Sequence, residues 1–195
     1  MKNLYRRLFG RLYWVQYSKE LSYKGEWKNG SFHGEGHLKY ANGNTFTGSF
    51  KSGTKNGFGH YKTSNGFEYI GDWLNGYQTG FGAICYKNGD LYEGDVQNGL
   101  RNGEGRFFQA SDCVWYKGAW IQGILYGHVE ISCSEWIFEG QLPEKDVISL
   151  GKLTYPDGSK YEGQILNFKR HGKGTLTAAS GEQTCGAWKD QLHVT

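Results

Sequence analysis

The sequence predicts an all-β fold, an elongated, twisted, single-layer antiparallel sheet built from about seven hairpin repeats. Three observations predict it: a glycine that returns about every 23 residues, strands in which aromatic and charged residues alternate, and turn dipeptides between them. A fixed period of this length is typical of repeat proteins in which each repeat is one supersecondary unit. The periodic glycines, spaced 23, 23, 23, 24, 22, 23 and 23 residues apart, are Gly25, Gly48, Gly71, Gly94, Gly118, Gly140, Gly163 and Gly186.

Composition supports one domain with large solvated faces. The chain has 195 residues, of which 31 are glycine and 37% are hydrophobic. No run of about 18 apolar residues is present, so no transmembrane helix is predicted. Residues 1–19 hold five basic residues and no acid, whereas the remainder holds 17 basic and 19 acidic residues. A nearly neutral body argues against a nucleic-acid-binding protein, which would carry a basic stripe.

Each repeat begins with a strand of alternating character. Tyr23, Gly25 and Trp27 share one face, and the intervening Lys24 and Glu26 share the other. Such alternation is typical of a half-buried strand. The returning strand carries its own set on one face: Gly34, Gly36, Leu38 and Tyr40.

Turn dipeptides then connect one repeat to the next. Asn-Gly and Asp-Gly pairs favour type I′ turns, because both residues tolerate positive φ. We therefore predict such turns, and a simple meander, at Asn42–Gly43, Asn65–Gly66, Asn88–Gly89 and Asp157–Gly158.

Glycine and aromatic residues are paired for a packing reason. A ring on one strand can lie flat over a glycine on its neighbour, where no side chain obstructs it. Two rows of rings would then lie along one face and line a groove for a partner. The groove candidates are Tyr23, Trp27, Phe46, Phe50, Tyr69, Trp73, Tyr92, Tyr116 and Trp120.

The repeat, Y-x-G-x-W-x-x-G-x-x-x-G-x-G, resembles the MORN (membrane occupation and recognition nexus) family over about residues 21–190. The resemblance implies a rigid adaptor in cytoskeletal, ciliary or membrane-associated assemblies. Members often self-associate, so a homodimer stays open. In some members the repeats precede a lysine methyltransferase or lipid kinase domain, and no stretch outside these repeats is long enough for one.

The chain divides into an N-terminal arm, residues 1–12, and a repeat array, residues 13–195. The array begins with a half repeat at 13–21, continues with repeats from 22, and ends with a half repeat at 183–195. The spacing of leucines in the arm favours a short basic amphipathic helix. Three roles stay open for it: a cap on the sheet edge, a membrane contact and a mitochondrial targeting segment. The candidate lipid-binding residues are Lys2, Arg6, Arg7 and Arg11.

The pattern is irregular between residues 111 and 150. Gly127-His128-Val129 stands where Gly-x-Gly is expected, and Leu142–Asp146 replaces a turn. Trp115 and Trp136 are additional aromatic residues there. Drift in a tolerant array explains this, and a specialised docking stretch is the alternative.

Chemical motifs are weak. His33 and His37 are four residues apart without a helical metal motif, and no catalytic set stands out, so we expect no enzyme, metal or cofactor. The glycine loops lack the G-K-[ST] of a phosphate-binding loop. The four cysteines form no C-x-x-C pair, which favours free thiols over disulfides.

Two functions follow as hypotheses. The first is a scaffold that binds a partner helix or peptide in the aromatic groove. The second is a peripheral membrane module that binds anionic phospholipid head groups through the arm. The expected location is cytoplasmic, with cytoskeletal, ciliary or peripheral membrane association, and mitochondrial as the minor alternative.

Overall fold

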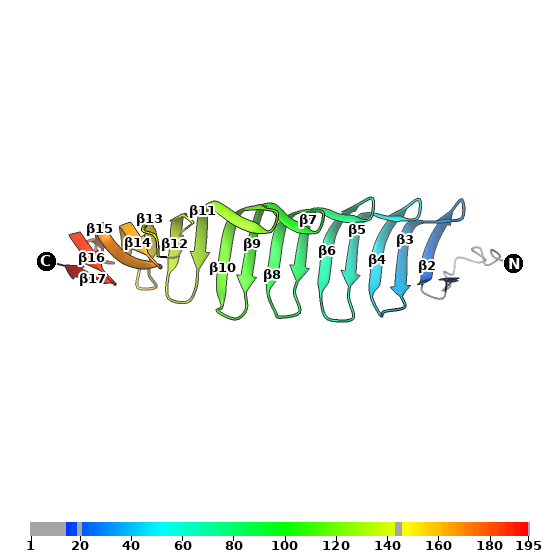
Figure 1. Ribbon diagram of the computed structural model, residues 1–195, viewed down its shortest axis with the longest axis horizontal. Coiled ribbons are helices and arrows are strands. Elements are labelled where there is room, and N and C mark those ends of the chain that lie inside the picture. Colours follow the sequence, from blue (N-terminus) through cyan, green and yellow to red (C-terminus); the bar gives the residue numbers. More distant parts are fainter. Residues whose placement is uncertain (1–14, 19–20, 143–145, 195) are drawn as a thin grey trace. The chain divides into compact units, whose positions relative to one another are not determined.

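A computed structural model describes residues 15–18, 21–142 and 146–194, and these residues form 17 strands, β1 to β17, and no helix (Figure 1). The predicted all-β fold is confirmed. The chain divides into two compact units, Met1–Arg101 and Asn102–Thr195. In each unit, strands that follow one another in the sequence pair antiparallel.

The first unit consists of hairpins that follow one another (Figure 1). Its strands are β1 (Val15–Ser18), β2 (Leu21–Lys28), β3 (Ser31–Tyr40), β4 (Thr45–Lys51), β5 (Thr54–Lys62), β6 (Glu68–Leu74), β7 (Tyr77–Cys85) and β8 (Leu91–Gln97). β1 pairs with β2, at the position where the sequence predicts a half repeat.

The second unit repeats the arrangement. Its strands are β9 (Leu100–Gln109, whose first two residues end the first unit), β10 (Val114–Ile121), β11 (Ile124–Ser132), β12 (Ile137–Gln141), β13 (Ser149–Thr154), β14 (Lys160–Leu166), β15 (Lys169–Thr177), β16 (Gln183–Lys189) and β17 (Leu192–Val194).

Turns form at the four predicted positions, but the type I′ turns lie inside the repeats, so the predicted turn type is wrong. Asn29 and Gly30, between β2 and β3, have φ of 49° and 77°, as a type I′ turn requires. At the predicted Asn42–Gly43 only the glycine has positive φ. That connection is a longer loop, closed by hydrogen bonds between Tyr40 and the Gly43 and Asn44 backbone. An Asn-Gly pair fits either turn, and only strand register distinguishes them.

The regular hairpins contain a β-bulge, which the alternating sequence pattern does not predict. In β6–β7, Gly71 pairs with Gly82 but the next residue, Asp72, pairs with Thr79, so β7 holds extra residues. The Tyr69 hydroxyl lies 3.0 Å from the carbonyl oxygens of both Asp72 and Thr79 and shares its single donor proton between them. A bulge leaves some backbone carbonyl oxygens without a partner on the neighbouring strand, and the hydroxyl supplies a hydrogen-bond donor to them.

Rings over glycines form the core, as predicted. A Cβ added at Gly71 would lie 2.6 Å from the Tyr69 hydroxyl and from the Gly82 Cα. The Trp73 indole reaches back across β5, donating a hydrogen bond to the Gly59 carbonyl at 3.3 Å. In the second unit, Trp188 makes the same contact with Gly174 at 3.1 Å. Each repeat therefore packs on the strand before it.

Candidate partner-binding surface

The structure places most of the predicted groove residues in the hydrophobic core. Seven of the nine are buried, with at most 5% of each residue exposed: Tyr23, Phe46, Phe50, Tyr69, Trp73, Tyr92 and Trp120. Trp27 and Tyr116 are half-buried. The seven rings stack against neighbouring rings and glycines, so they offer little free surface. A partner-binding role for all nine stays a prediction, and for seven it would require core packing to open.

Lys55, which the repeat pattern does not distinguish, lies among these rings. The Lys55 ammonium is 4.4 Å from the Tyr61 ring centroid, 4.5 Å from that of Trp73 and 5.0 Å from that of Phe46. The Tyr40 ring centroid lies 5.5 Å from the same ammonium. The ring faces attract the cation, whereas burial lowers the pKa of Lys55 to about 8.

The same arrangement recurs at two other places and has a sequence signal. Arg101 lies 6.0 Å from the Tyr92 ring, and Arg170 lies 5.7 Å from Tyr155 and 4.7 Å from Trp188. Each cation has a tyrosine 15 residues before it: Tyr40 and Lys55, Tyr86 and Arg101, Tyr155 and Arg170. Comparing the repeats column by column would have found these pairs.

The opposite, outward face of the first unit carries exposed apolar side chains. They lie on β5 to β8 and at the start of β9, and between 38% and 65% of each residue is exposed. With two carboxylates among them they form what we name the apolar–acidic surface: Phe58, Ile70, Asp72, Leu74, Tyr77, Phe81, Leu91, Asp95 and Leu100.

Strand register explains why these side chains lie together. Leu74 pairs with Tyr77 beside the tight turn, Phe58 pairs with Asp72, and Phe81 pairs with Asp95. Four strands about 4.8 Å apart span about 14 Å, and seven residues of one strand span about 20 Å. The surface is therefore wide enough for two to three turns of a helix, each about 5.4 Å long.

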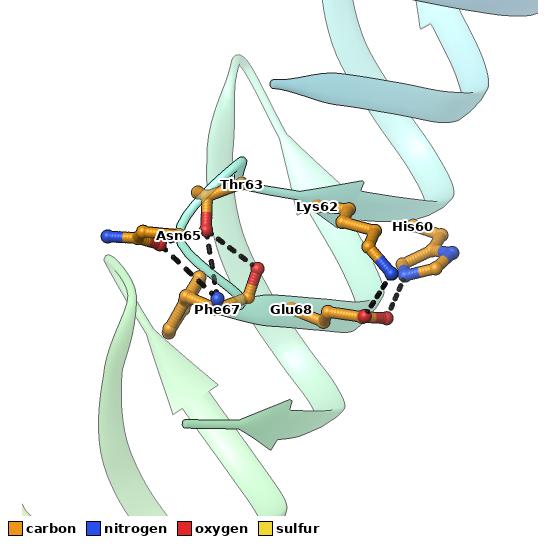
Figure 2. Close-up of polar contacts among 6 residues, drawn as sticks. All are labelled: His60, Lys62, Thr63, Asn65, Phe67 and Glu68. Atoms are coloured by element: carbon orange, nitrogen blue, oxygen red, sulfur yellow. Dashed lines mark hydrogen bonds and ion pairs between the residues drawn. The ribbon is translucent and has the colours of Figure 1, made fainter. Parts of the chain in front are cut away.

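The charge on this face is negative. Strands β6, β7 and β8 hold four acidic residues, Glu68, Asp72, Glu93 and Asp95, and no lysine, arginine or histidine. Glu68 is the acidic residue that β5 neutralises: Lys62 and His60 lie 2.7 and 2.8 Å from its carboxylate oxygens (Figure 2). Hydrogen bonds from Lys62 and then His60 hold the pKa of Glu68 below its usual value.

A short loop, residues 63–67, joins Lys62 on β5 to Glu68 on β6 (Figure 2). The Thr63 hydroxyl donates to the Phe67 carbonyl at 2.9 Å and accepts a hydrogen bond from the Phe67 amide, and Asn65 contacts the same turn (Figure 2). The loop fixes where β6 begins, and therefore which of its residues face outward.

The additional tryptophans of the irregular stretch have packing partners. Trp136 stacks on Phe168, with ring centroids 4.8 Å apart, beside the core cluster of the second unit. Trp115 packs on Phe108 at 4.9 Å, and Arg106 lies 5.3 Å from its ring. Their contacts favour drift with local repacking, and docking there stays a prediction.

His33 and His37 belong to no cluster of three or more metal-binding side chains in the part of the chain that the structure describes. All four cysteines are free. Lys2, Arg6, Arg7 and Arg11 lie outside the described residues. Within residues 15–18, 21–142 and 146–194, no helix is long and apolar enough to cross a membrane.

Solved structures share some similarity with the chain. The TCP10 domain of CPAP from Danio rerio is 12% identical, with 92% of this chain and 91% of that chain covered and a TM-score of 0.48. The SAS-4 TCP domain of Drosophila melanogaster, in complex with a proline-rich motif of Ana2, is 12% identical, with 96% and 99% covered and a TM-score of 0.30. Likeness this weak supports no inference about function. No curated protein matches the chain significantly.

The family model for the MORN repeat matches residues 23–45, 46–67, 69–91, 92–114, 150–160 and 161–183. The matches cover more than half of the chain and omit residues 115–149, most of the irregular stretch. Five of the six matches begin at the inward-facing ring of a repeat, Tyr23, Phe46, Tyr69, Tyr92 or Tyr161, and each spans one hairpin and the loop after it. The match at 150–160 covers most of β13 and the loop that follows. The chain belongs to the MORN repeat family.

Proposed function

We propose that the protein is a non-enzymatic scaffold that binds a helix or peptide of a protein partner on the apolar–acidic surface. One observation carries the proposal. Within the described residues 21–101, all seven exposed large hydrophobic side chains fall between Phe58 and Leu100, and none lies in the first repeat. Single exposed apolar residues are ordinary, whereas a contiguous patch marks an interaction site.

The residue types support this choice of face. Phe58, Tyr77 and Phe81 are exposed aromatic residues held by paired strands, so little side-chain freedom is lost when a partner covers them. Aromatic residues are enriched among those that contribute most to binding. The proposed location is cytoplasmic, within a cytoskeletal, ciliary or membrane-associated assembly, as the family resemblance implies.

The test exchanges the outward residues of two repeats. Leu74→Lys with Tyr77→Ser gives the third repeat the residues that the first repeat has at the same positions, Lys28 and Ser31. The full chain and this variant are compared by affinity capture with quantitative mass spectrometry. Direct binding of the purified partner is then measured. A matched control, Lys28→Ala with Ser31→Ala, alters the same columns of the first repeat.

We expect the double change at Leu74 and Tyr77 to weaken partner binding at least tenfold and the control to leave it unchanged. An unchanged partner affinity for the Leu74 and Tyr77 variant would overturn the proposed surface.

Membrane binding is the second candidate, and its support is the charge of residues 1–19, which hold five basic residues and no acid. Each basic residue near an anionic surface contributes about 1 kcal/mol. Deletion of residues 1–12 removes Lys2, Arg6, Arg7 and Arg11 and should abolish flotation with acidic liposomes if this function holds. It should leave a protein partner bound to the apolar–acidic surface.

A further inference from the structure

We infer that the segment recognised by the apolar–acidic surface is a basic amphipathic helix of a protein partner. This inference rests on the proposed function and adds the chemistry of the partner. It depends on the charge of β6 to β8, on the register that alternates rings with carboxylates, and on the spacing between those carboxylates.

The charge of the surface selects a cationic partner. The charged side chains of β6, β7 and β8 are all carboxylates. On the neighbouring β5, His60 and Lys62 contact Glu68. The other basic residues of the flanking strands in this unit, Lys55 and Arg101, lie over the rings of Tyr61 and Tyr92. Asp72 and Asp95 lie farther along the strands, beside the rings of Phe58 and Phe81. Complementary charge steers a partner and sets its register, and an anionic partner would be repelled.

Rings and carboxylates alternate across the strands. Phe58 on β5 pairs with Asp72 on β6, and Phe81 on β7 pairs with Asp95 on β8. A lysine or arginine above such a pair would meet a carboxylate and an exposed ring together, and both attract a cation. Its aliphatic stem would cover the ring.

The spacing of the two pairs favours a helix that crosses the strands. Asp72 and Asp95 are two strands apart, or about 10 Å. Residues i and i+7 of an α-helix lie on one face with a rise of about 10.5 Å. Apolar residues at i+3 and i+4 would then lie over β7, the strand between β6 and β8, where the Phe81 side chain is exposed.

The experiment uses the full chain and three synthetic helical peptides of one design, labelled with fluorescein. They carry leucines at i+3 and i+4 and, at i and i+7, lysine in the first, glutamine in the second and glutamate in the third. Binding is measured by fluorescence anisotropy at low and moderate salt, and peptide helicity is checked by circular dichroism.

We expect the lysine peptide to bind at least tenfold more tightly than the glutamate peptide, with glutamine between them, and the difference to shrink with salt. Asp72→Asn with Asp95→Asn should remove this preference. Glu26→Gln with Glu35→Gln, which changes two exposed acids of the first repeat, should keep it. Leu74→Lys with Tyr77→Ser should weaken binding of all three peptides.

Three results would overturn the inference: no binding of the lysine peptide, equal affinity for the lysine and glutamate peptides, or a preference that survives Asp72→Asn with Asp95→Asn. Equal affinity for all three peptides, if Leu74→Lys with Tyr77→Ser still weakens their binding, would overturn only the partner class and leave the docking surface standing. The partner-capture experiment decides the proposed function separately.

Discussion

The first and third repeats have the same interior and different exteriors. In both, Tyr pairs with an aliphatic residue, Gly pairs with Gly and the bulge follows, and the tyrosine and tryptophan rings meet edge to face at 5.3 and 5.4 Å. Outward, the first repeat shows Lys24, Lys28 and Glu35, whereas the third shows Ile70, Leu74 and Phe81. Since the interiors match, the outward residues are free to differ without a change of fold.

This comparison shows that the two faces of a strand are under different physical constraints. Inward side chains must fit rings over glycines, so their size is restricted. Outward side chains contact solvent or a partner, so only their solubility and binding matter. The predictions below test that division, beginning with the interior.

The largest effect is expected for Gly71→Val. The new side chain would meet Tyr69 and the β7 backbone, at distances of 2.6 to 2.7 Å from its Cβ. We expect the free energy of unfolding to fall by about 2–4 kcal/mol, measured by urea denaturation. Ile70→Val, one residue away on the outward face, is the control and should change it by less than about 0.5 kcal/mol. Equal stability of the two variants would contradict the ring-over-glycine account.

A smaller loss is expected for Tyr69→Phe. The change keeps the ring but removes the hydroxyl that donates to the Asp72 and Thr79 carbonyls, which should cost about 1–2 kcal/mol. Tyr77→Phe removes a hydroxyl from the exposed face of the same repeat and should have almost no effect. If both changes cost the same, the hydroxyl does not stabilise the bulge.

Next comes a pH-dependent effect at Lys55. Burial lowers its pKa from 10.5 to about 8, so between these values the folded protein binds fewer protons here than the unfolded chain. Stability from this group therefore rises as pH increases from about 8 toward 10.5. Relative to Lys55→Met, the wild-type protein should gain stability between pH 7.5 and 10 in urea unfolding. A constant difference would show that Lys55 keeps its ordinary pKa.

The smallest effect on stability is expected for Leu74→Lys with Tyr77→Ser. Both side chains are more than half exposed, so the free energy of unfolding should change by less than about 1 kcal/mol. Thermal and urea unfolding would measure it. A loss as large as that for Gly71→Val would place these residues in the core and remove the division between the faces.

The sequence predicted the strands and the inward rows because period-two alternation depends on local residue order. It placed the type I′ turn at Asn42–Gly43 rather than Asn29–Gly30, because the same dipeptide suits both connections. It could not show that Phe46 and Tyr69 are enclosed, since a row of rings on one face fits an open groove equally well. Bulges, which bend the strands, depend on pairing between strands.

The proposed binding surface escaped prediction for a related reason. Phe58 and Phe81 occupy the middle position of Gly-x-Gly, where the repeat pattern specifies no residue type, and their place in the pleat turns them outward. Reading each outward column across successive repeats would have shown that Ile70 and Leu74 replace threonine and lysine.

Because these tryptophans bond to the strand before their own, the repeats are completed in chain order during synthesis. Trp73 donates to Gly59, and Trp188 donates to Gly174, so each ring completes a strand made earlier. On a ribosome, a hairpin whose following repeat carries such a tryptophan would therefore lack that indole until the next hairpin is made. The growing end would stay unfinished by one repeat, and a stalled nascent chain would expose its last Gly-x-Gly strand to chaperones or to another nascent chain.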